Sequence, residues 1–170
     1  LRPARKKVLA SRPGARKVVI HDFNNDQRPD LMVLMAQAHE ELVIYYNQGD
    51  GNFIEKKVLQ FPPVFGASYF ELTDFNQDGH PDILLTNGDN WDYSPIQKNY
   101  HGIRIYLNDG QHVFEEAWFY PMYGTSKAVA RDFDQDGALD TAAISFYEAL
   151  DEPQQGFVYL SNKGNLQFEG

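Results

Sequence analysis

Three nine-residue stretches of this chain are almost identical, and they set the register of everything around them. They run over Asp22–Asp30, Asp74–Asp82 and Asp132–Asp140. Each has Asp or Asn at positions 1, 3, 5 and 9 and Phe at position 2. Alternate side chains of a tight loop can turn toward one centre, and carboxylate and amide oxygens are the ligands that calcium takes in proteins. We therefore interpret these stretches as calcium loops.

The spacing predicts a ligand set for each of up to three calcium ions. Positions 1, 3, 5 and 9 would supply side-chain oxygens, and position 7 would supply its backbone carbonyl. Position 6 is Gly in the second and third loops but Gln27 in the first, so we expect a strained and weaker first site if this position needs a positive φ. The predicted ligands are Asp22, Asn24, Asp26, Arg28 and Asp30; Asp74, Asn76, Asp78, His80 and Asp82; and Asp132, Asp134, Asp136, Ala138 and Asp140.

The chain repeats three times around these loops. A Gly precedes each loop by eight residues, and an Asn followed by Phe six positions later comes after it. These anchors keep the same order in all three copies, which is the signature of a repeat architecture. The chain is predicted to be one propeller segment over 1–170, with repeats at 14–65, 66–123 and 124–170.

Each repeat is expected to form four strands. The segment before each loop alternates apolar and polar residues, and the segment after it is almost continuously apolar, which predicts a strand buried on both faces. A third strand and a hairpin turn follow, and the fourth strand begins at Phe53, Phe114 or Phe168. Four antiparallel strands at this period predict an all-β fold built from β-propeller blades.

The number of blades predicts partners. Closed propellers have about 4–8 blades, so three blades imply further blades or other subunits. Residues 5–9 resemble residues 55–59, which belong to the fourth strand of the first repeat. Residues 5–9 are therefore expected to form a strand of a neighbouring blade.

Composition argues against several kinds of partner and site. The net charge of -9 argues against nucleic acid as a partner, because phosphates attract a basic surface. The absence of cysteine excludes disulfides and zinc-cysteine sites. No apolar run approaches the roughly 20 residues of a membrane span.

The loops, the upstream glycines and the Asn-to-Phe hairpins together resemble the FG-GAP/VCBS repeats of integrin α-subunits and bacterial surface proteins. The resemblance covers residues 8–170 and is closer to the VCBS type, because only Phe65-Gly66 shows the FG dipeptide. It implies a propeller of about seven blades, with calcium in the loop between strands one and two. It also implies an extracellular, cell-surface or periplasmic protein that acts in adhesion or in binding a protein or carbohydrate ligand.

The connections between the second and third strands are the most variable part of the repeats, and they are expected on the face opposite the calcium loops. Variable loops on one face of a repeat protein often form the binding face. The longest connection, 87–102, could present an aromatic platform, and the alternative is that its aromatic residues pack on their own blade. The candidates are Trp91, Tyr93, Tyr100 and His101.

No catalytic motif is apparent in the sequence, so we do not expect an enzyme. The rival hypotheses are part of a propeller polysaccharide lyase or hydrolase, or a scaffold domain in a larger assembly. The Phe of each loop is expected to be a core plug between blades (Phe23, Phe75 and Phe133). Three histidines are expected to be ordinary surface residues with no clustered partner: His21, His80 and His112.

Overall fold

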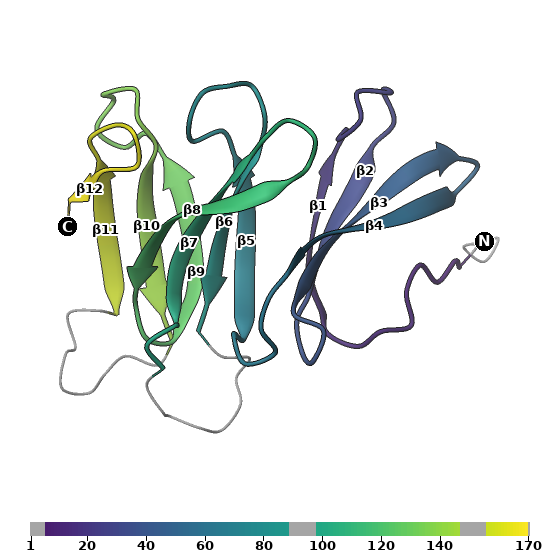
Figure 1. The fold of residues 1–170 in the computed structure, drawn as a ribbon, viewed down its shortest axis with the longest axis horizontal. Coiled ribbons are helices and arrows are strands. Elements are labelled where there is room, and N and C mark those ends of the chain that lie inside the picture. Colours follow the sequence, from purple (N-terminus) through teal and green to yellow (C-terminus); the bar gives the residue numbers. More distant parts are fainter. Residues whose placement is uncertain (1–5, 89–97, 147–155, 170) are drawn as a thin grey trace, which may run out of the picture.

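In the part of the chain that the structure describes, the regular structure consists of strands that form three four-stranded antiparallel sheets (Figure 1). The structure, a computed structural model, describes residues 6–88, 98–146 and 156–169. The first sheet contains β1 (Ala15–His21), β2 (Asp30–Met35), β3 (Glu41–Gly49) and β4 (Asn52–Gln60). The second contains β5 (Ala67–Thr73), β6 (Asp82–Asn87), β7 (Gly102–Asn108) and β8 (Phe114–Pro121). The third contains β9 (Thr125–Arg131), β10 (Asp140–Ser145), β11 (Phe157–Asn162) and β12 (Phe168–Glu169).

Each sheet is a simple meander in which every strand pairs with its neighbours in the sequence. The first strands of successive sheets contact one another, β1 with β5 and β5 with β9, while the fourth strands lie at the outer edges of their sheets. This arrangement is that of consecutive propeller blades, with the first strands nearest the axis. The predicted all-β fold of propeller blades is confirmed, and the sheets are called the first, second and third blades below.

The first strands begin at Ala15, Ala67 and Thr125. Each start lies two residues before the segment whose alternation predicts the strand: Lys17–His21, Tyr69–Thr73 and Lys127–Arg131. The pairing register shifts within this early part, between Ala15 and Lys17 in β1 and between Ala67 and Tyr69 in β5. A bulge adds one residue and so breaks the period-2 alternation on which the sequence prediction depended. The fourth strands begin at Asn52, Phe114 and Phe168, within one residue of the predicted Phe53, Phe114 and Phe168.

Two apolar cores separate the three blades. The first contains Leu34 and Ile44 from one side and Phe70 and Leu85 from the other, and all four are fully buried. In the second core, Ile105 of the second blade packs with small residues of the third. Every residue of β6 is buried, because the central blade has a neighbour on both faces, as its continuous apolar run predicted.

The loop phenylalanines do not all behave alike. Phe23 and Phe75 are buried between the first and second and between the second and third blades. Phe133 is 50% exposed, so its prediction as a buried plug is wrong in this structure. The reason is that its side of the third blade has no further sheet against it among the described residues.

The N-terminal segment lies against the first blade. Residues 6–9 form no strand within this chain, and the Lys7 Nζ atom donates hydrogen bonds to the Gly51 carbonyl and the Asn52 Oδ1 atom, at 2.7 and 2.9 Å. Leu9 packs with Val43 on the face of the blade that points away from the second blade. That residues 5–9 join a neighbouring blade stays a prediction. Among the described residues, no helix is long and apolar enough to cross a membrane.

Candidate functional site

The three Asp loops join the first and second strands of their blades, and they lie at the same end of the stack (Figure 1). In each loop the position-1 carboxylate accepts hydrogen bonds from the backbone N–H groups of positions 5 and 6. In the second loop these bonds run to Asp74 from Asp78 and Gly79, at 3.1 and 2.9 Å. The loop therefore folds around its own acidic side chains, which explains why one sequence pattern gives one conformation three times.

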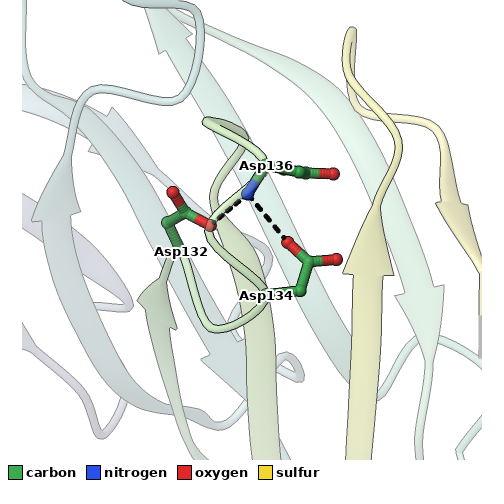
Figure 2. Close-up of side chains that lie close together, drawn as sticks. All are labelled: Asp132, Asp134 and Asp136. Carbon is green, nitrogen blue, oxygen red and sulfur yellow. Dashed lines mark hydrogen bonds between the residues drawn. The ribbon is translucent and has the colours of Figure 1, made fainter.

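The third loop contains the densest group of acids. The side chains of Asp132, Asp134 and Asp136 are exposed and each offers an oxygen within 4.8 Å of the others (Figure 2). The Asp136 backbone N–H donates to Asp132 Oδ1 at 3.1 Å and to Asp134 Oδ1 at 3.2 Å. Three hard oxygen ligands at this spacing fit calcium, which takes oxygens at about 2.3–2.6 Å from the ion. Asn24 and Asn76 supply an amide oxygen at the corresponding position of the other loops.

In the second loop, hydrogen bonds to the acid at position 5 favour its ionised form. The backbone N–H of His80 donates to Asp78 Oδ1 at 2.8 Å, and the Asn76 side chain donates to its other oxygen at 2.8 Å. These two bonds lower the pKa of Asp78. The carboxylate is thus held in the form that a cation needs.

The acid at position 9 has a different environment. Asp30, Asp82 and Asp140 are fully buried. Asp82 accepts hydrogen bonds from the Phe75 N–H at 2.8 Å and from the Asn108 N–H at 2.9 Å. Burial raises the pKa of Asp82 against the effect of these bonds.

Both oxygens of each position-9 acid are used in this way in all three blades. The carboxylate fastens the start of its own loop to the end of the third strand. Position 9 therefore has a structural role that does not depend on a metal. Its ligand role stays a prediction. In the third blade the Asp140 Oδ2 atom also accepts a hydrogen bond from the Tyr159 hydroxyl at 2.8 Å, so both lone pairs of that oxygen are used.

The first loop departs from the other two. Gln27 has a φ of 67°, where Gly79 and Gly137 have 86° and 95°, so position 6 does adopt the left-handed conformation that favours glycine. The Arg28 Nη2 atom also lies 2.7 Å from Asp26 Oδ2, which gives this acid a cationic partner within the loop. The third loop also has a cationic neighbour, since the Lys163 Nζ atom lies 3.5 Å from Asp134 Oδ2, but this contact is longer and comes from outside the loop.

The predicted aromatic ligand face is partly described. Trp91 and Tyr93 lie outside the described residues. Tyr100 stacks on Phe65, with ring centroids 5.8 Å apart and planes 11° apart, and His101 is only 3% exposed. The Tyr100 carbonyl accepts hydrogen bonds from Asn87 and Arg104, and the His101 carbonyl accepts one from the Met122 N–H. The backbone of both residues is therefore held by the second blade, which agrees with the alternative that the sequence left open, while the Tyr100 ring lies on Phe65 at the end of the first repeat.

Three histidines that looked unrelated in the sequence line one cavity of about 90 Å³ between the first and second blades: His21, His80 and His112. They share this cavity, which was not predicted, but no contact among the three rings contradicts the prediction that they have no clustered partner. They come from β1, from the second Asp loop and from the β7–β8 hairpin, so only the stacking of blades brings them together. Comparing equivalent positions of the repeats could have indicated a shared groove. Among the described residues, the third-loop acids form a compact group of potential metal ligands, and these histidines do not.

The comparisons with known proteins identify the repeat. Residues 22–85 match the family model of an FG-GAP-like repeat, from the first residue of the first Asp loop to β6. No curated protein matches the chain. The match confirms, over residues 22–85, the resemblance to FG-GAP repeats that the Asp loops indicated.

Proposed function

We propose that this chain is a calcium-stabilised part of a β-propeller that acts outside the cytoplasm, in adhesion or in binding a protein or carbohydrate ligand. The observation that carries the proposal is the acidic group of the third loop, whose three carboxylates lie within 4.8 Å of one another. The same loop conformation recurs in the other two blades, so the proposal extends to up to three ions.

The role of calcium in this proposal is structural. In the third loop Asp132, Asp134 and Asp136 would hold the ion, and the equivalent oxygens would do so in the other loops. The ion would offset the repulsion among exposed carboxylates and fix the connection between the first two strands of each blade. Binding of this kind stabilises the fold by mass action.

A role outside the cytoplasm is supported by the repeat and by composition. FG-GAP-like repeats are typical of extracellular or surface proteins. The chain contains no cysteine, so calcium would supply the reinforcement that disulfides give to many exported domains.

The open face of the third blade supports a larger assembly. Phe133, Ile144, Phe157 and Tyr159 are all at least 44% exposed on this face. An apolar group of this size on a surface indicates a contact with another protein unit. We propose that further blades or another subunit cover it. The alternatives of a polysaccharide lyase or hydrolase and of a scaffold domain stay predictions.

Calorimetry in calcium and in a chelator tests the proposal. Calcium is expected to raise the melting temperature, and magnesium at the same ionic strength is expected to raise it less, because magnesium gives up its water reluctantly. A melting temperature that is the same with calcium and with chelator would overturn the calcium role.

A further inference from the structure

The second and third blades enclose a cavity of about 410 Å³ on the side of the Asp loops. Its walls come from the start of the second Asp loop, the end of β7, Ala138 of the third loop and the β11–β12 hairpin. Ligand sites in proteins have volumes of roughly 300–1,000 Å³, so this cavity is large enough for a small molecule.

The equivalent groove between the first and second blades is largely filled. His80 occupies position 7 of its loop, where the third loop has Ala138, and His112 lies four residues after the Asn that ends the third strand, where the third blade has Leu166. His112 and Leu166 share the same backbone conformation, with φ values of 61° and 58°. The two grooves therefore differ through side chains at matching positions.

The two hairpin glycines show the same difference directly. A Cβ atom placed on Gly110 would lie 2.7 Å from the His80 Nε2 atom, so the imidazole covers that hairpin. A Cβ atom on the equivalent Gly164 would meet nothing within 4 Å. The small residue at Ala138 thus leaves open the space that His80 fills in the other groove.

The lining of the open cavity suits an uncharged, hydroxyl-rich ligand. Phe75, Leu107 and Leu166 give it an apolar surface. Its polar lining residues all have carboxamide side chains: Asn76, Gln77, Asn162 and Asn165. None of the described lining residues carries a charge, although the chain as a whole has a net charge of -9. Carboxamides present both donors and acceptors, which matches the hydroxyl groups of a sugar.

Two of these carboxamides have atoms available for a ligand. The Gln77 Nε2 atom donates to the Gly137 carbonyl at 2.7 Å, which joins the second loop to the third and fixes the position of the side chain. Its Oε1 atom, and the whole carboxamide of Asn165, make no hydrogen bond within the described part of the chain. The fixed Oε1 atom of Gln77 and the exposed carboxamide of Asn165 can therefore both bind a ligand in this cavity.

From these observations we infer that the cavity between the second and third blades binds an uncharged carbohydrate of about monosaccharide size. The inference rests on the ligand-binding part of the proposed function, and it names the class of ligand. It places recognition on the side of the Asp loops, whereas the sequence placed it on the opposite face.

The test uses amide chemical shifts of the whole chain titrated with methyl α-D-glucopyranoside, methyl α-D-galactopyranoside and methyl α-D-mannopyranoside. At least one of these is expected to shift the resonances of Gln77, Asn165 and Leu166, with a Kd of about 1 mM or below. D-Glucuronate is expected to bind at least tenfold more weakly, because the cavity lacks a cationic partner. No shifts with any neutral probe, or shifts confined to residues outside the cavity, would overturn the inference.

Variants give a second criterion. The double substitution Ala138→His with Leu166→His should fill the cavity as the histidines fill the other groove, and abolish the shifts. Gln48→His, near the end of β3 in the first blade, is the control and should leave binding unchanged. Binding that survives the filled cavity would overturn the inference, and if the double variant fails to fold, the shift map of the unsubstituted chain decides.

The outcome can be separated from that of the proposed function. Stabilisation by calcium without sugar binding would overturn the carbohydrate site alone. Sugar binding without stabilisation by calcium would support the site and overturn the structural role of calcium.

Discussion

The Tyr46 hydroxyl lies 2.8 Å from His112 Nδ1, and this hydrogen bond crosses the boundary between the first and second blades. The His112 ring also meets the edge of Phe23, with centroids 5.7 Å apart. Burial lowers the pKa of His112, and the nearby Lys56 lowers it further, while Asp30 and Asp109 act in the opposite direction. The folded protein therefore favours the neutral imidazole at this contact.

Acidification should weaken this contact between blades. The unfolded chain has a His pKa of about 6.5, and the folded value is lower, so the unfolded state binds more protons between the two values. The contribution of His112 to stability is present above about pH 6.5 and is lost as the pH falls through the folded value. Melting temperatures from neutral to mildly acidic pH should decline less steeply for His112→Leu, which introduces the residue of the third blade, than for the unsubstituted chain.

A control separates His112 from the other histidines. His39 lies in the β2–β3 connection, and His39→Gln should keep the original dependence of the melting temperature on pH. Parallel curves for the unsubstituted chain and His112→Leu would show that this residue does not couple stability to pH.

Calcium should stabilise the second and third loops more than the first. Asp26 already has Arg28 as a cationic partner, whereas no salt bridge is formed by Asp78 within the described residues. A bound ion stabilises by about 2.7 kcal/mol when its free concentration is 100 times Kd. Asp78→Asn and Asp136→Asn should each remove more of the calcium-dependent rise in melting temperature than Asp26→Asn does. Equal losses at the three loops would contradict this ranking.

The strain at Gln27 should be measurable without calcium. A left-handed conformation costs a residue with a Cβ atom about 1–2 kcal/mol, and glycine avoids this cost while losing some stability through its freedom in the unfolded chain. Gln27→Gly is therefore expected to increase the free energy of unfolding in urea by about 0.5–1 kcal/mol. The reverse change, Gly79→Gln, should decrease it by a similar amount, and a destabilising Gln27→Gly would show that the side chain compensates for its strain.

The buried Asp82 should matter even when calcium is removed. In Asp82→Asn, the amide NH2 group would face one of the two backbone donors of Phe75 and Asn108, so one buried N–H would lose its acceptor. Such a loss costs about 1–3 kcal/mol. Urea unfolding in chelator should detect this cost for Asp82→Asn and almost none for the exposed Asp78→Asn. A loss of stability that appears only with calcium would mean that Asp82 acts as a metal ligand and not through its hydrogen bonds to the backbone.

The features predicted correctly from the sequence are those that each repeat determines locally. The Asp loops and hairpin glycines fix strand register, because every copy needs the same backbone hydrogen bonds and positive φ values. The hydrogen bonds by which Asp82 joins its loop to the third strand were not predicted. Its partner Asn108 is 26 residues away, and the pattern alone suggested a metal ligand. The His112 contact and the open cavity beside Ala138 were missed for a related reason: each combines residues of two blades. Phe133 is the opposite case. Its loop has the same motif as the other two, which predicted burial between blades, but no further sheet packs against this residue within the described part of the chain, and it is 50% exposed.

Arg104 should contribute far more to stability than an exposed arginine. Only 6% exposed, its guanidinium lies between the rings of Phe65 and Phe119, with its central carbon 4.7 and 4.0 Å from their centroids. It also donates to both oxygens of Glu116 at 2.9 Å and to the Tyr100 carbonyl at 3.0 Å.

A lysine at position 104 would keep the charge but lose the planar group that makes these contacts together. Arg104→Lys is therefore expected to lower the free energy of unfolding by about 1–3 kcal/mol, measured in urea. Arg131, which is 62% exposed and paired with Glu71, is the matched control. Arg131→Lys should change stability by less than about 0.5 kcal/mol, because exposed ion pairs contribute little. Equal effects of the two substitutions would mean that the stacked guanidinium adds nothing beyond its charge.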